Sequence, residues 1–329
     1  MRQFKQFNLF TILLSLTLVI FISSANKVTS QSLLDFRKLI PNKADSIKII
    51  QISDVHYEEK ANNHGKRLLQ DSGAILSKAV SEINNIKNTD YVIFSGDMIN
   101  SPDEKELNKF LSIIKTIKYP WAAIVGNHDV AIFGKLTKQH YMNILNEANC
   151  NIPNERYYSF SPKPNWLIIG LDGVIDNMIS ANGKFDKEEL KWLDNQLTLN
   201  KDKHVIIFQH FPIVEPYKSA THKVLNVDDY LNIINNHKNV VAVLAGHYHA
   251  AKVDVVNNIA YIATPALVQF PNAYRILDFE EKNGKIIIKT QIKQVNYKTL
   301  NADFAKQCKE EPLNCGNSND RNAIIELKK

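Results

Sequence analysis

Seven side chains of three types, His, Asp and Asn, occur in five short blocks that are spread along most of this 329-residue chain. His, Asp and Asn supply the usual nitrogen and oxygen ligands of divalent metal ions. The residues are Asp54, His56, Asp97, Asn127, His210, His247 and His249. A lone Asp or His at the end of a strand is usually a turn former or a cap. Seven of them in five ordered blocks indicate a metal centre instead.

The seven residues are enough to bind two metal ions. The first ion would take three ligands, Asp54, His56 and His249. The second ion would take three others, Asn127, His210 and His247. Asp97 would bridge the two, because cations held about 3.5–4 Å apart repel strongly and need a shared carboxylate between them. The metal-binding groups therefore account for all seven side chains.

The chemistry expected of such a centre is hydrolysis. Two cations lower the pKa of a bound water toward about 7, so that a metal-bound hydroxide can act as the nucleophile at neutral pH. His128 follows ligand Asn127 directly but is not needed as a ligand. We expect His128 to be the catalytic acid that protonates the leaving alkoxide. Without a thiolate among the ligands, the cofactors expected are two divalent ions of Mn, Fe, Zn or Co, which the sequence does not rank.

Apolar runs stand in front of all five blocks and predict the strands that must position them. These runs cover residues 47–53, 91–95, 121–125, 205–209 and 240–245. Short apolar runs bounded by turn residues are typical of strands buried on both faces. Because ligands of α/β proteins gather at the carboxyl ends of the strands, the five blocks are expected to meet at one rim.

The remaining pattern predicts helices between these strands and a β-rich second half. Apolar spacing and capping residues predict helices over 65–87, 101–117, 186–199 and 227–237. Further strands are predicted at 157–160, 165–171, 252–256, 259–263, 273–279 and 285–293. We therefore expect an α/β fold with two packed sheets and helices outside them.

The order of the five blocks resembles the calcineurin-like metallophosphoesterase superfamily, and every ligand position of that pattern is filled here. The resemblance extends from Asp54 to His249. It implies a four-layer α/β/β/α sandwich with a dinuclear metal site at the carboxyl ends of the strands. The enzyme class that it implies is a metal-dependent phosphoric ester hydrolase.

Differences within the blocks narrow the resemblance to one branch. The second block lacks the Arg of protein phosphatases, and Asn100 stands where purple acid phosphatases carry a Tyr ligand. His210-Phe211-Pro212 is similar to the His-x-Pro turn of bacterial cyclic-nucleotide and glycerophosphodiester phosphodiesterases. The branch implies cleavage of a phosphodiester bond in a small molecule. We expect His64 and His222, both in polar loops, to contact that substrate.

Two alternatives to a diesterase remain open. A secreted phosphomonoesterase or nucleotidase would use the same metals, although about 80 residues after His249 are too few for the separate substrate domain of large nucleotidases. A catalytically silent binding scaffold would lack ligands that are all present here. A nucleic acid is not expected as a partner, because Lys and acidic residues alternate and the net charge is only +6. The oligomeric state stays open.

The N-terminus predicts export. Arg2 and Lys5 precede an apolar run over 9–22, which is shorter than the roughly 18–20 residues of a spanning helix. Small residues near 25 and 30 predict a signal peptide over 1–30, with an uncleaved anchor as the alternative. We expect a metallophosphoesterase domain over 31–300, a C-terminal extension over 301–329, and a secreted or periplasmic protein with no stable membrane insertion after cleavage.

The chain has three cysteines, whose oxidation state depends on the cellular compartment. Cys308 and Cys315 flank a short loop and could pair in an oxidising compartment. The sequence does not decide whether they do. Cys150 is expected to be a small buried residue.

Overall fold

The computed structural model describes residues 46–131, 136–149, 152–176, 178–297 and 303–328. All of them belong to one compact unit, Ala44–Lys329. The expected signal peptide over 1–30 and Cys150 lie outside the described residues. Within the described part of the chain, no helix has both the length and the apolar character needed to cross a bilayer.

Six strands form the first sheet, in the order β12-β11-β10-β1-β2-β3. Their bounds are β1 Ser46–Ile52, β2 Tyr91–Ser95, β3 Trp121–Ile124, β10 Ala273–Lys282, β11 Lys285–Gln294 and β12 Asn322–Lys328. β1, β2 and β3 run parallel, whereas β10, β11 and β12 add antiparallel neighbours beside β1. The carboxyl ends of the three parallel strands therefore lie at one edge.

The second sheet also has six strands, in the order β4-β5-β6-β7-β9-β8. Their bounds are β4 Tyr158–Lys163, β5 Trp166–Gly170, β6 His204–Phe208, β7 Val240–Ala245, β8 Lys252–Val256 and β9 Ile259–Ala263. β5, β6, β7 and β9 are parallel, so the blocks that follow β6 and β7 leave the sheet at the same edge.

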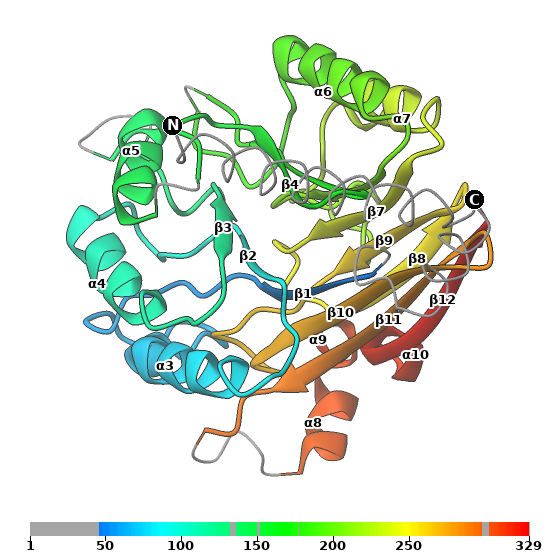
Figure 1. Ribbon diagram of the computed structural model, residues 1–329. Helices are drawn as coiled ribbons and strands as arrows, with labels where there is room; N and C mark the ends of the chain where they lie inside the picture. The colour runs from blue at the N-terminus through cyan, green and yellow to red at the C-terminus, as the bar shows by residue number, and fades with distance from the viewer. Residues whose placement is uncertain (1–45, 132–135, 150–151, 177, 298–302, 329) are drawn as a thin grey trace, which may run out of the picture. The chain divides into compact units, whose positions relative to one another are not determined.

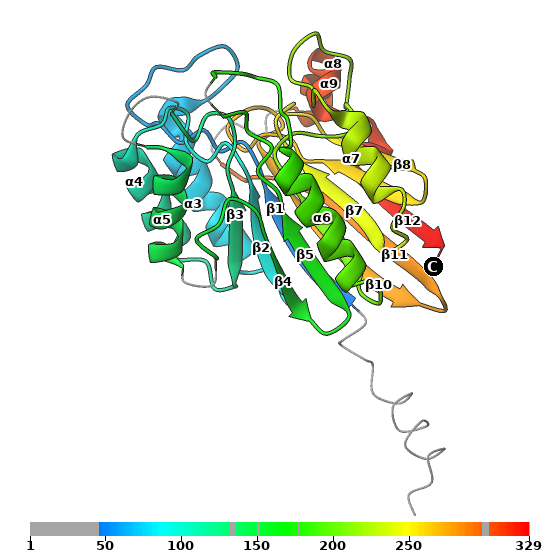
Figure 2. The same cartoon turned by 90° about the horizontal axis from the view of Figure 1, so that it is seen from above.

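Helices cover the outer faces of both sheets (Figures 1 and 2). α3 (Ser72–Ile83), α4 (Glu104–Ile114) and α5 (Lys138–Ala148) pack on the first sheet, in one hydrophobic cluster with β1, β2 and β3. α6 (Lys187–Leu199) and α7 (Val227–Ile234) pack on the second sheet, in a separate cluster. The expected four-layer α/β/β/α arrangement is confirmed.

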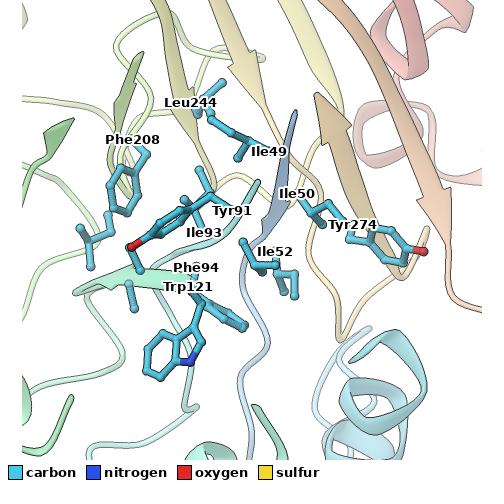
Figure 3. Packing of buried hydrophobic residues seen from close by; sticks show 14 of the residues in the cluster. Ile49, Ile50, Ile52, Tyr91, Ile93, Phe94, Trp121, Phe208, Leu244 and Tyr274 are labelled. Carbon is cyan, nitrogen blue, oxygen red and sulfur yellow. The ribbon is translucent and has the colours of Figure 1, made fainter. Parts of the chain in front are cut away.

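Side chains alternate across the central strands as a two-sided strand requires. Figure 3 shows Ile49 on the side of Leu244 and Phe208, which belong to the second sheet. Phe94 points the other way and its ring centroid lies 5.5 Å from that of Phe110 in α4. Each apolar run therefore packs against a sheet on one face and helices on the other, which explains why these runs are continuously apolar.

Two of the predicted helices are found but are shorter than expected. The helix predicted over 101–117 is α4, Glu104–Ile114, and the Asp103 side chain caps it by accepting hydrogen bonds from the backbone N–H groups of Lys105 and Glu106. The helix predicted over 65–87 is found only over Ser72–Ile83, preceded by the 3-10 turn Leu69–Asp71. Residues before it form a turn closed by a bond from Arg67 N to His64 O. The apolar spacing over 65–87 therefore predicted a longer helix than the one found.

The region expected as a C-terminal extension contributes to the sheet and to a small helical segment. β12 pairs antiparallel with β11 at the edge of the first sheet. α8 (Phe304–Glu310), α9 (Pro312–Cys315) and α10 (Ser318–Arg321) precede it. A disulfide joins Cys308 to Cys315 and ties α8 to α9.

Candidate metal centre

The seven residues expected to bind metal meet at the carboxyl edges of the two facing sheets. They follow strands β1, β2, β3, β6 and β7, and most are fully buried. The members are Asp54, His56, Asp97, Asn127, His210, His247 and His249. Residues that are distant in the chain are thus brought into one cluster, as the contact between His56 and His249, 193 positions apart, shows.

The backbone at this cluster is strained. Five of its residues have left-handed φ angles: Asp54 (51°), His56 (43°), Asp97 (52°), His247 (68°) and His249 (53°). A non-glycine residue in such a conformation costs on the order of 1–3 kcal/mol and persists only where its surroundings hold it. Gly126 is needed for a different reason, because a Cβ atom there would lie 2.2 Å from both N and Oδ1 of Asp97.

One group of ligand atoms consists of Asp54, His56 and His249, which all lie within 4.8 Å of one another. Asp54 Oδ1 is 3.3 Å from His249 Nε2. His56 Nε2 is 3.2 Å from the same His249 nitrogen. Two imidazole nitrogens and a carboxylate oxygen that face a common point are suited to a divalent cation.

A second group consists of Asp97, His210 and His247. Asp97 Oδ2 lies 3.2 Å from His210 Nε2, and His247 Nδ1 lies 3.1 Å from that nitrogen. Asp97 Oδ2 is also 3.6 Å from His56 Nε2 of the first group. Asp97 therefore stands between the two groups, as a bridging carboxylate must.

Carbonyl oxygens determine which ring nitrogen faces the centre in three of its four His residues, His210, His247 and His249. His210 Nδ1 donates to Ser95 O at 2.9 Å, and His247 Nε2 donates to Ala181 O at 2.7 Å. His249 Nδ1 pairs with Gln269 Oε1 at 3.0 Å. Because these oxygens accept the hydrogen, the opposite ring nitrogen keeps its lone pair for a metal. Such partners orient metal-binding His residues and raise their basicity.

Asn127 provides an independent test of whether these residues suit a metal ion. Its Oδ1 is buried and has no hydrogen-bond partner in the described structure. Leaving a buried acceptor unsatisfied costs about 1–3 kcal/mol. A cation would satisfy this oxygen, so the residues present fit a divalent metal with nitrogen and oxygen ligands.

The protonation states suit metal binding as well. Burial works against ionisation of Asp54 and Asp97, but a neighbouring His outweighs it in each case. His249 holds the pKa of Asp54, and His210 that of Asp97, well below the usual range of a carboxyl group. Burial lowers the pKa of His56 and His247, which keeps both imidazoles neutral. Burial also opposes protonation of His210, but Asp97 prevails and raises the pKa of His210 to about 9 without metal. Metal binding would displace that proton.

His128 lies beside the centre and is held by two hydrogen bonds. Its backbone N–H donates to Asp97 Oδ1 and its Nδ1 donates to Asn100 O, both at 2.8 Å. Its ring centroid is 4.7 Å from that of His56. The Asn100 side chain is otherwise engaged, since it donates to Glu58 and accepts from Arg67. Position 100 therefore does not supply a metal ligand here.

The two His residues expected to contact substrate are placed differently. The His222 ring lies 5.0 Å from the His247 ring, at the border of the centre. His64 is exposed, and no described contact joins its side chain to the predicted ligands. Arg67, three residues later, acts on the centre electrostatically. Burial is the largest cause of the lowered pKa of His56 and of His222, and the positive charge of Arg67 lowers both pKa values further.

Sequence reasoning missed Arg67, Gln269 and Asn314. Asn314 Nδ2 donates to His249 O, and Asn314 O accepts from Ala251 N, both at 2.9 Å. Asn314 therefore holds the backbone on both sides of Ala250, directly after the last strand-end block. These residues come from loops and from the C-terminal segment, where no local pattern marks them.

Comparison with known proteins agrees with this geometry. The sequence profile of the family described as Calcineurin-like phosphoesterase matches residues 47–251, more than half of the chain. A probable cyclic nucleotide phosphodiesterase of Xenorhabdus bovienii is 25% identical over 228 residues, 67% of this chain and 86% of that protein. A probable glycerophosphodiester phosphodiesterase of Arcobacter nitrofigilis is 26% identical over 215 residues, 64% of this chain and 75% of that protein.

Among solved structures, a dimetal phosphatase from Danio rerio superimposes with a TM-score of 0.61 at 17% identity. The match covers 77% of this chain and 99% of that structure, which shows a shared fold. The profile match spans all five blocks and every predicted ligand. The chain therefore belongs to the calcineurin-like phosphoesterase family and is a metal-dependent phosphoric ester hydrolase.

Proposed function

We propose that the protein hydrolyses phosphodiester bonds of a small molecule with two divalent metal ions, in a secreted or periplasmic location. The observation that carries the reaction is the position of Asp97. It lies between two groups of ligand atoms, and its other oxygen accepts the backbone N–H of His128. Two cations and a proton donor would thus share one rigid site.

The metals, when bound, would lower the pKa of a water molecule and neutralise charge on the phosphate. His128 has a separate task. Asn100 O holds its Nδ1–H, so the protonated ring can release only the Nε2 proton without losing that bond. In the reaction, a water molecule loses one proton to solvent and its oxygen bonds to phosphorus, the bond from phosphorus to the alcohol breaks, and the Nε2 proton of His128 passes to the departing oxygen. Solvent then returns a proton to His128. A proton donor of this kind contributes about 10²–10⁴-fold.

Two observations support a diester as the substrate. The curated relatives described above are named as phosphodiesterases. The second block carries no Arg, and the Asn100 side chain is bound to Glu58 and Arg67. An open site that lacks the Arg of protein phosphatases can accept a phosphate with two substituents.

The test is a substrate screen of the metal-loaded mature protein with Mn²⁺, Fe²⁺, Zn²⁺ or Co²⁺. We expect bis-nitrophenyl phosphate to be cleaved with higher kcat/KM than the nitrophenyl monoester, phosphoserine peptides to be poor substrates, and the enzyme to lack a purple absorption band. A monoester preference of about tenfold, or about 1.4 kcal/mol in the transition state, would establish the phosphomonoesterase alternative instead.

The role of His128 is tested with leaving groups of different basicity. His128→Ala should keep both metals but lose activity strongly toward alkyl esters, whose alkoxide must be protonated. The loss should be small for nitrophenyl esters, because nitrophenolate departs without a proton. His140→Ala, which changes a partly exposed His in α5 that pairs with Glu104, is the matched control. Equal losses for both ester classes would exclude His128 as the acid.

Export is supported by two features. The basic and apolar pattern over residues 2–22 is typical of a signal peptide. The Cys308–Cys315 disulfide is of a kind that persists in oxidising compartments. Mass spectrometry of protein from its native host should show a new N-terminus near residue 26 or 31, and an intact Met1 in the cytosolic fraction would refute export.

A further inference from the structure

A cavity of about 770 Å³ opens next to the candidate metal centre. Asn127 and His128 form part of its wall, so it borders both a predicted metal ligand and the proton donor. Its size lies within the range of about 300–1,000 Å³ that is usual for small-molecule sites. If His128 donates the proton, as proposed above, the ester oxygen that receives it would lie close to this wall.

We propose that this cavity binds the departing alcohol and selects one that is uncharged and has an aromatic or aliphatic body. The inference rests on the proposed function, because the role of His128 decides which side of the phosphate faces the cavity. The retained part of the substrate would then lie on the opposite side, toward His222 and His247.

One wall of the cavity is apolar. It includes Val130, Val174, Ile175, Met178 and Ile179. Ile179 is 93% exposed and Met178 is 55% exposed, so these two neighbours add an exposed apolar surface to this wall. A bound organic group would cover both, which gives their position at the mouth of the cavity a physical reason.

The two cations of the lining are already paired with carboxylates. Lys138 Nζ lies 2.8 Å from Asp172 Oδ2 and 2.9 Å from Asp176 Oδ1. Arg156 lies 2.7 Å from Asp176 Oδ2 and 3.5 Å from Asp186 Oδ2. Two positive charges therefore face three carboxylates.

This pairing is what argues against a charged alcohol. A second phosphate or carboxylate in the cavity would lose water without gaining an unpaired cation among the described lining residues. Burial of an anion without a partner is costly. An uncharged alcohol loses little hydration and covers the apolar wall, so the lining favours it.

The decisive substrate is an unsymmetrical diester, methyl benzyl phosphate. Methanol and benzyl alcohol are alcohols of similar acidity, so the ratio in which they are released reports binding rather than chemistry. We expect benzyl alcohol to be released at least about fivefold faster than methanol. With a 4-carboxybenzyl group in place of benzyl, release of that alcohol should fall about tenfold or more. Equal release of methanol and benzyl alcohol, or equal rates for the carboxylated ester, would overturn the proposal.

Paired variants separate the cavity from general surface effects. Ile179→Ser should lower the benzyl-to-methanol ratio about two- to fivefold and leave metal content unchanged. Ile324→Ser is the matched control, because Ile324 is the same residue type, 72% exposed, on edge strand β12. A ratio that Ile179→Ser does not alter, or that both variants alter equally, would contradict the assignment.

Two further measurements keep the proposal distinct from the diesterase proposal. If only monoesters are hydrolysed, the diesterase function fails, but benzyl phosphate should still exceed 4-carboxybenzyl phosphate in kcat/KM. Independently of activity, titration of benzyl alcohol into the metal-free protein should shift the NMR methyl resonances of Ile179 and Val174 but not that of Ile324. Absence of shifts at Ile179 and Val174 would refute the cavity as the alcohol site.

Discussion

Replacing Glu189 by Gln should stabilise the protein at pH 8.5 and have little effect near pH 4.5. Glu189 lies on α6, is only 3% exposed, and its Oε1 accepts the backbone N–H of Asp172 at 2.7 Å. Burial, and after it the charge of Asp172, raises the pKa of Glu189 from 4.5 to about 8. The amide of the substituted side chain would keep an oxygen for the same hydrogen bond but would carry no charge at any pH.

The direction in which stability changes with pH follows from the number of protons that the folded and unfolded states bind. Between pH 4.5 and about 8 the folded protein keeps a proton on Glu189 that the unfolded chain has lost, so stability falls as pH rises. Above pH 8 the full cost is present. A window of about 3.5 pH units at about 1.4 kcal/mol per unit sets an upper limit near 5 kcal/mol. Because relaxation and water entry reduce this, we expect a gain of about 2 kcal/mol or more for Glu189→Gln at pH 8.5.

The assay is urea-induced unfolding of metal-loaded wild-type and variant protein at pH 4.5 and pH 8.5. Glu188→Gln is the matched control, because Glu188 is exposed on the same helix and loses the same charge. The gain of Glu189→Gln over wild type should grow with pH, whereas Glu188→Gln should change stability by less than about 0.5 kcal/mol at either pH. A gain for Glu189→Gln that is the same at both pH values would refute the reasoning.

Three substitutions test how the metal centre is held. Asp97→Ala should lose metal and activity together, and elemental analysis that still found two ions per chain would exclude the bridging role. Gly126→Ala adds a Cβ that would lie 2.2 Å from Asp97 N, so a chelator titration should show at least about tenfold weaker metal binding. Asn314→Ala removes the hydrogen bond to His249 O and should weaken binding about tenfold in the same titration, whereas exposed Asn319→Ala should not.

The strands could be predicted closely because each carries its own pattern. β8 and β9 have the bounds that alternation and turn residues indicated, Lys252–Val256 and Ile259–Ala263. α5 (Lys138–Ala148) and β12 (Asn322–Lys328) were missed. α5 does carry apolar residues at helical spacing, Tyr141, Ile144, Leu145 and Ala148, and this pattern was overlooked. β12 is an edge strand with only two buried residues, so its own apolar pattern is weak.

The candidate metal ligands and their order could be predicted from the sequence alone, because each block lies directly after its own apolar strand. Which of their atoms face the centre depends on the tertiary structure. The hydrogen bonds that orient His210, His247 and His249 come from Ser95, Ala181 and Gln269, which are far away in the chain or in unpatterned loops. Orientation of this kind depends on packing between distant segments, and local sequence patterns do not encode it.

The residues around the centre also depend on the tertiary structure. Arg67 and Asn314 lie in a turn and in the disulfide-linked C-terminal segment, and they reach the site because both sheets end at one edge. The cavity beside the centre combines residues from separate segments, His128 and Ile179 among them, and its Lys138 is paired with Asp172. The reaction class follows from residue types that the sequence already contains. The proposed preference for an uncharged alcohol depends instead on which charged side chains the fold brings together, and a linear sequence does not specify those pairs.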